Sequence, residues 1–135
     1  MSISSKIIED NFVKFDKIDL IVHRFEHELF SVNPQNIIEK LNKWDQDFGS
    51  FNEIFATQII QIPYKDKDQY YNSLIAFVQN KDMREAYDST VLVFSDFSDI
   101  HHDLERAFSR FVISFPSYSL PKITTFFGGF NYGVV

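Results

Sequence analysis

The chain has 135 residues, of which 44% are hydrophobic and 17% aromatic, and 13 basic against 19 acidic side chains give a formal net charge of −6. This length suits one globular domain, and the acidic balance argues against a nucleic-acid partner, which requires clustered basic side chains. The absence of cysteine excludes disulfides, thiolate catalysis, iron–sulfur clusters and cysteine-based zinc sites. No run of about 18 apolar residues occurs, so we predict no transmembrane helix.

The first part of the chain predicts a short strand followed by a short helix. Residues 1–17 are weakly patterned and we expect a flexible segment, with one domain over residues 18–135. Ile18, Leu20 and Val22 alternate, which is typical of a strand over residues 18–24, and residues 25–30 then form one or two helical turns. The alternative is a single helix over residues 19–31.

Two helices are predicted next. Asn33 and Pro34 form a helix start, and Gly49 suits the left-handed position after its end. Ser50 and Glu53 have the spacing of a capping box, so a second helix begins at once and closes before Pro63. The core stripes of these two helices are Ile37, Ile38, Leu41, Trp44 and Phe48, and then Phe51, Ile54, Phe55, Gln58 and Ile62.

Two further helices follow a charged loop. Asp66 and Gln69 can cap the first, whose apolar positions are Tyr70, Tyr71, Leu74, Ile75, Phe77 and Val78. Asn80 and Asp82 mark its end and the next start, where Asp82 and Glu85 form a second capping box. The helical period then continues through Met83, Ala86, Tyr87, Thr90, Val91 and Phe94.

The strongest amphipathic pattern lies in residues 99–115. Its apolar stripe is Ile100, Leu104, Ala107, Phe108, Phe111, Val112 and Phe115. Ser98 or Asp96 can cap the start, and Pro116 ends the helix. We predict a mainly α-helical α+β domain in which five to six helices pack around this helix. Leu104, Phe108, Phe111 and Phe115 are expected to be largely buried, surrounded by Ile37, Leu41, Phe55 and Leu74.

The end of the chain predicts a small β component. Residues 122–127 are rich in β-branched and aromatic side chains, Gly128 and Gly129 mark a turn, and Val134 and Val135 begin a return strand. Residues 122–127 should therefore form a β hairpin with residues 130–135 or a short sheet with residues 18–24. A strand that begins at the last residue indicates a fragment of a longer protein. We expect such an uncovered edge to self-associate.

No complete catalytic, cofactor-binding or metal-binding constellation can be assigned. His23 and His27 have the spacing of two ligands on a helix, but Ser31 replaces the second histidine of an H-E-x-x-H motif. His101 and His102 point about 100° apart on a helix, so no tight zinc binding is expected. The carboxylates of Asp96, Asp99, Asp103 and Glu105 are explained by their place at a helix start. Arg24 is predicted to form either an internal ion pair or a surface contact.

Several ordered motifs carry a family resemblance that spans the chain from about residue 18 to its end. They are Arg24-Phe25-Glu26 with Leu29-Phe30, Asn33-Pro34, Ala107-Phe108 through Phe115-Pro116, Pro121-Lys122-Ile123, and Gly129-Phe130-Asn131-Tyr132-Gly133-Val134-Val135. Together they resemble the GldB-type gliding-motility lipoproteins of Bacteroidetes. The resemblance implies a cell-envelope lipoprotein linked to gliding and to secretion across the outer membrane, with a fold similar to zincin-type metallopeptidases.

The sequence departs from this family in two respects. It has no lipobox cysteine and no signal-peptide apolar region at its start, and it ends where the family continues into a second, mostly helical half. No catalytic residue of the family can therefore be transferred. We expect a non-enzymatic envelope component that acts through contacts with envelope or motility proteins. The alternative is a fragment of a zincin-like metal-dependent hydrolase whose active site lies beyond residue 135.

Overall fold

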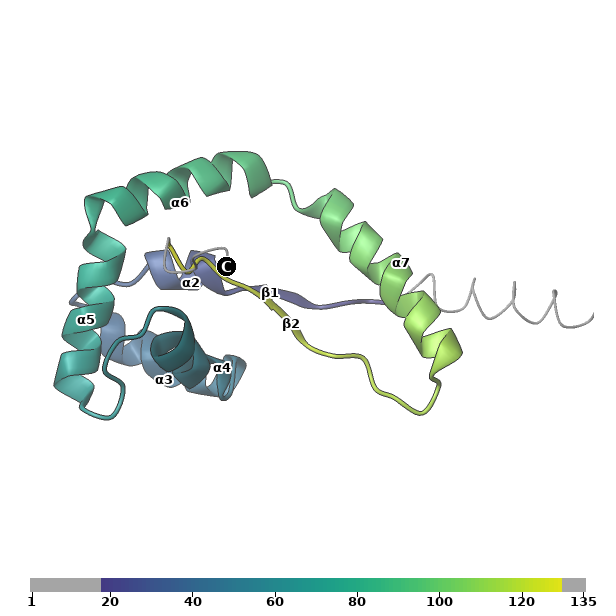
Figure 1. Cartoon of the computed structure of the whole chain (residues 1–135), viewed down its shortest axis with the longest axis horizontal. Coiled ribbons are helices and arrows are strands. Elements are labelled where there is room, and N and C mark those ends of the chain that lie inside the picture. Colours follow the sequence, from purple (N-terminus) through teal and green to yellow (C-terminus); the bar gives the residue numbers. More distant parts are fainter. Residues whose placement is uncertain (1–17, 130–135) are drawn as a thin grey trace, which may run out of the picture. The chain divides into compact units, whose positions relative to one another are not determined.

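A computed structural model describes residues 18–129 (Figure 1), and it confirms a mainly α-helical fold with a small β part. The predicted flexible segment 1–17 and the predicted return strand lie outside the described residues. The elements are β1 (Val22–Arg24), α2 (Phe25–Phe30), α3 (Ile37–Asp47), α4 (Phe51–Ile54), the π-helical turn η1 (Phe55–Ile59), α5 (Lys67–Gln79), α6 (Lys81–Phe94), α7 (Ser98–Ser114) and β2 (Ile123–Thr125).

The described residues divide into two compact units. Residues 18–23 and 94–124 form one, called here the α7 unit, and residues 24–93 and 125–129 form the other, called here the helical unit. The expectation of one domain over residues 18–135 stays a prediction, because compactness does not establish which parts fold independently. Within the described part of the chain, no helix has both the length and the apolar composition needed to cross a bilayer.

The two strands form a two-stranded parallel sheet, so Ile123–Thr125, the middle of the predicted segment 122–127, pairs with the early strand (Figure 1). The strand predicted over residues 18–24 is confirmed in its second half, and α2 follows at once. A single helix over residues 19–31 is therefore wrong. The β-branched residues Val22 and Ile123 suit a pleated and half-buried surface.

The core of the helical unit is built around the Phe25 ring, which is fully buried. Its centroid lies 4.9 Å from that of Trp44 and 5.0 Å from that of Phe55, both in edge-to-face arrangements that aromatic rings favour. The predicted burial of Ile37, Leu41, Phe55 and Leu74 is confirmed. The other buried apolar residues of this cluster are Leu29, Phe30, Val32, Trp44, Ala56, Ile59, Ile60, Tyr70 and Val78.

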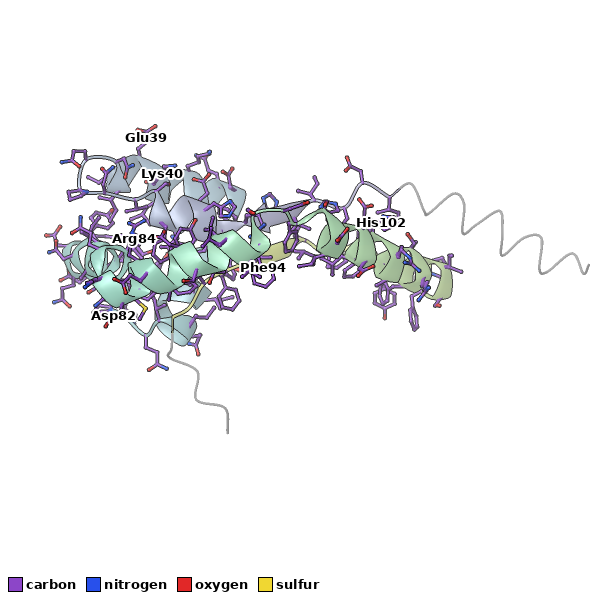
Figure 2. All side chains as sticks on the ribbon, turned by 90° about the horizontal axis from the view of Figure 1, so that it is seen from above. Glu39, Lys40, Asp82, Arg84, Phe94 and His102 are labelled. Carbon is purple, nitrogen blue, oxygen red and sulfur yellow. The ribbon has the colours of Figure 1, made fainter. Side chains whose placement is uncertain are left out.

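Helix α6 has no fully buried residue, yet it is attached to this core near its start. The side chain of Arg84 projects from α6 (Figure 2). Its Nη1 donates to the Phe30 carbonyl oxygen at 3.2 Å, and its guanidinium lies 5.0 Å from the centre of the Phe30 ring. The Tyr87 ring stacks on the Phe30 ring with centroids 3.9 Å apart. The helix ends at Phe94, and its last turn exposes Leu92 and Val93.

Several predicted helix ends are confirmed by their hydrogen bonds. The Asn33 side chain accepts from the backbone N–H groups of residues 35 and 36, although the regular helix begins at Ile37. Asp66 accepts from the Gln69 N–H at 3.0 Å, and Gly49 has the expected left-handed φ of 56°. At the start of α6, the side chain that caps is that of Asn80. The capping box predicted at Asp82 is therefore wrong, because the helix already begins at Lys81.

The segment after Gly49 departs most from its predicted stripe. The Ser50 side chain makes no capping bond, and α4 passes into η1, where the Ile60 N–H donates to the Phe55 carbonyl oxygen five residues earlier. A π-helical turn contains an extra residue, so it rotates the residues that follow. Ile54 and Gln58 are consequently exposed, and the buried positions are Phe55, Ala56, Ile59 and Ile60. On α3, Ile38 is also exposed, so its assignment to the core was wrong.

The prediction that α7 supplies the central core is wrong. Phe115 is 51% exposed and Phe111 is 36% exposed, while Leu104 and Phe108 are only half-buried. The one buried residue of α7 is Ser109, which lies two positions from Phe111 and therefore about 200° around the helix. Leu104, Phe108 and Val112 are half-buried, so α7 packs through Ser109 and one edge of its apolar stripe, and it exposes the other edge with Phe111 and Phe115. Its predicted end before Pro116 is confirmed.

A buried polar network links three helical elements of the helical unit. The Tyr70 hydroxyl donates to Asn52 Oδ1 at 2.6 Å, and Asn52 Nδ2 donates to Asp45 Oδ1 at 3.2 Å. Tyr70 and Asn52 are almost completely buried. Burial of the phenol, which removes it from water, raises the pKa of Tyr70 well above its ordinary value.

We expect this burial to make the protein sensitive to base. The folded state keeps Tyr70 protonated while the unfolded chain ionises near pH 10, so stability is fully present below about pH 10 and falls above it. Tyr70→Phe should make the free energy of unfolding fall less steeply with pH above about 10. Chemical denaturation at a series of pH values measures this slope. The exposed Tyr118 gives a matched control, because Tyr118→Phe should leave the slope unchanged.

Candidate functional site

The four histidines lie at two separate places. His23 is in β1 and His27 is on α2, so the two side chains do not share one helix face as metal ligands would. On α7, His101 Nε2 lies 3.0 Å from Glu105 Oε1, one turn along the helix, whereas His102 is exposed. Within residues 18–129, no three histidine or carboxylate side chains cluster as a metal site requires. The expectation of no zinc binding stays a prediction.

The acidic residues around residue 99 lie at the start of α7, as predicted. Asp96 accepts hydrogen bonds from both the backbone N–H and the hydroxyl of Ser98, and these bonds lower the pKa of the Asp96 carboxyl. Asp99 is in the first turn, where a negative charge is favourable. Of the two residues predicted to cap this helix, Asp96 is therefore the one that accepts a backbone bond.

A compact polar cluster joins the beginning and the end of the helical unit. Arg24 Nε donates to Glu26 Oε1 and also lies 3.0 Å from Thr125 Oγ1, and the Thr125 hydroxyl donates to Glu26 Oε2 at 2.7 Å. The Glu26 side chain is only 5% exposed and that of Arg24 is 18% exposed. Of the two predictions made for Arg24, the internal ion pair is thus confirmed.

The charged groups of this cluster are paired with one another, so we assign the cluster a structural role. Both carboxylate oxygens of Glu26 accept hydrogen bonds, as a buried carboxylate requires. Thr125 was not identified from the sequence. Its spacing of 99 residues from Glu26 carries no local signal, and only the pairing of β2 with β1 brings the hydroxyl into place.

The residues that follow Thr125 pack closely against other residues of the helical unit. The Phe127 ring packs at 5.5 Å from Phe30. A Cβ on Gly128 would lie 2.8 Å from a methyl carbon of Ile59, and one on Gly129 would lie 2.6 Å from the Met83 sulfur. Gly129 also has a left-handed φ of 69°, which agrees with the predicted glycine turn. Residues 125–129 are therefore an integral layer of the helical unit.

The α7 unit exposes a group of aromatic side chains, called here the α7 aromatic cluster: Phe108, Phe111, Phe115 and Tyr118. Neighbouring centroids are 5.2 Å apart for Phe111 and Phe115, and 6.1 Å apart for Phe115 and Tyr118. Tyr118 is 64% exposed, and Leu120 is exposed nearby in the chain. The cluster gathers large apolar side chains at the end of α7, and their exposure rises from the half-buried Phe108 to Phe115 and Tyr118, which mostly face water.

One hollow of about 170 Å³ lies in the α7 unit between residues 19–21 and residues 120–122. Asp19 and Lys122 are its only charged lining residues, and the others are Leu20, Ile21, Leu120 and Pro121. This volume is below the range of about 300–1,000 Å³ that small-molecule sites occupy, and two opposite charges do not form a catalytic set. The α7 aromatic cluster is therefore the better candidate for a functional surface.

Comparison with known proteins identifies a matching family model. The family model described as gliding motility protein GldB matches residues 8–135, which include every residue of the polar cluster and of the α7 aromatic cluster. No curated protein and no solved structure matches the chain significantly.

Proposed function

We propose, from the premise that this chain belongs to the gliding motility protein GldB family, that it is a non-enzymatic cell-envelope component which acts through contacts with other proteins. The family is one of lipoproteins, which implies association with the envelope. In this proposal the protein serves gliding and the protein secretion associated with it. Its partners are other envelope or motility proteins, and residues 130–135 contribute to self-association.

The observation that supports this proposal is the α7 aromatic cluster. Aromatic side chains are enriched where proteins bind one another, because they bury large areas with little loss of conformational freedom. Phe111 and Phe115 are adjacent on one side of α7, and Tyr118 extends the same group beyond the helix end. A contiguous exposed apolar patch of this kind marks an interaction surface.

The proposal is tested by complementing a strain that lacks the gene. The wild-type gene should restore colony spreading and secretion, whereas a Phe111→Ser, Phe115→Ser double variant should restore neither although it accumulates to normal levels. A matched control is Leu92→Ser with Val93→Ser, because these α6 residues are also apolar and exposed. The control should restore both functions. Full spreading by the Phe111, Phe115 variant would contradict the assignment of the contact surface, and normal gliding without the gene would contradict the function itself.

A further inference from the structure

The exposed face of α7 runs along the helix beyond the aromatic cluster. Ile100 in the first turn is 37% exposed, Ala107 in the middle is exposed, and Phe115 after the last turn is 51% exposed. These residues belong to one apolar stripe, and Ser109, the buried residue, lies on the other side of the helix. Leu104, Phe108 and Val112 of the stripe are half-buried, so the exposed surface is the edge of the stripe that carries Ile100, Ala107, Phe111 and Phe115, and it runs about the length of the helix.

The charges beside this stripe change sign along α7. Asp99, Asp103 and Glu105 lie in its first half, and Arg106 and Arg110 lie in its second half. From Arg106 to the end of the sequence there is no acidic residue. Asp103 and Arg110 are seven residues apart, which is two turns, so they lie on the same flank of the stripe. The Asp103 side chain is 78% exposed, and both residues are accessible from outside.

We propose that the α7 stripe binds the same stripe of a second copy of this chain in antiparallel orientation. This inference deepens the proposed function, because it names the protein that the exposed surface contacts. A two-fold axis midway between Asp103 and Arg110 passes beside Ala107. It brings Asp103 of each copy close to Arg110 of the other, so the same attraction forms twice.

Two features favour this arrangement over others. A parallel pair would place Asp103 against Asp103 and Arg110 against Arg110, which is repulsive. Ala107, the smallest residue of the stripe, lies where the two helices would cross, and a small side chain there allows their backbones to approach. The apolar surface and the order of charges along α7 are thus self-complementary in an antiparallel pair.

The inference is tested with the full chain by sedimentation over a concentration series. The wild type should show a reversible monomer–dimer equilibrium. Asp103→Arg alone and Arg110→Asp alone should each weaken dimerisation about tenfold or more, because both contacts become repulsive. An equimolar mixture of the two single variants should restore the dimer, since each copy then supplies the charge that the other lacks. The double variant, with the charges exchanged, should also associate like the wild type.

Several results would overturn the inference. A wild type that stays monomeric at about 100 μM would show that α7 does not pair. Association that is unaffected by the single variants, or that the mixture fails to restore, would place the contact elsewhere, for example at residues 130–135. Circular dichroism of each variant confirms that α7 remains helical. These outcomes are independent of gliding, so a monomer that still supports gliding through the aromatic cluster would reject the dimer and retain the proposed function.

Discussion

Replacing Phe25 by alanine is expected to lower the free energy of unfolding by about 3–5 kcal/mol, the usual cost of removing a buried phenylalanine ring. Phe25 is completely buried, and its ring contacts those of Phe48, Phe51 and Phe55 as well as Trp44. The loss combines apolar surface withdrawn from water with a cavity that four surrounding rings cannot easily fill. Chemical denaturation measures the change.

The matched control for this experiment is Phe108→Ala on α7. Full burial would predict the same large loss there, but Phe108 is only half-buried and borders exposed residues. We expect a loss of about 1 kcal/mol, in proportion to the smaller area that leaves water. Similar losses for the two variants would contradict the assignment of the core to the helical unit.

The second large effect is expected at Glu26. Glu26→Ala should lower the free energy of unfolding by about 3 kcal/mol, because it removes the carboxylate that faces the Arg24 guanidinium in a largely water-free site. The same change removes the acceptor of the Thr125 hydroxyl. The substitution should therefore weaken the contact that joins the first residues of the helical unit to its last segment.

Thr125→Val separates these contributions, because it keeps the shape of the side chain and leaves the ion pair in place. It removes the hydrogen bond donated to Glu26 and the one accepted from Arg24, so it should cost about 2 kcal/mol, at about 1 kcal/mol for each bond. A value for Thr125→Val as large as that for Glu26→Ala, measured in parallel by denaturation, would show that the hydroxyl rather than the charge pair holds the cluster together.

Local signals predicted local structure well. The alternation of Ile18, Leu20 and Val22 indicated the early strand, and Asp66 and Gly49 act as a start and an end signal in the way their chemistry requires. These features depend on a few neighbouring residues, so the sequence contains all the information. The capping box at Ser50 failed because the helix that follows changes to a π-helical turn, and no short motif encodes that change.

The burial of α7 could not be predicted for a different reason. Periodicity shows that one face of a helix is apolar, but it does not show which surface covers that face. The sequence therefore identified the stripe of Phe108, Phe111 and Phe115 correctly and assigned it wrongly to the core. The polar cluster could be predicted only in part for the same reason. Arg24 and Glu26 are close in the sequence and could be predicted as a pair, whereas Thr125 becomes their partner only in the folded chain.

The path of residues 125–129 has a consequence for how the protein is made. Helices α2 to α6 are contiguous in the chain and can form contacts as soon as they leave the ribosome. The layer that packs Phe127 against Phe30 and joins Thr125 to Glu26 is synthesised almost 100 residues later. At about 5–20 residues per second, this interval lasts roughly 5–20 s. During that time Glu26 lacks the hydrogen bond from Thr125 and the Phe30 ring lacks its contact with Phe127, so we expect the nascent helical unit to bind chaperones more readily than the completed one.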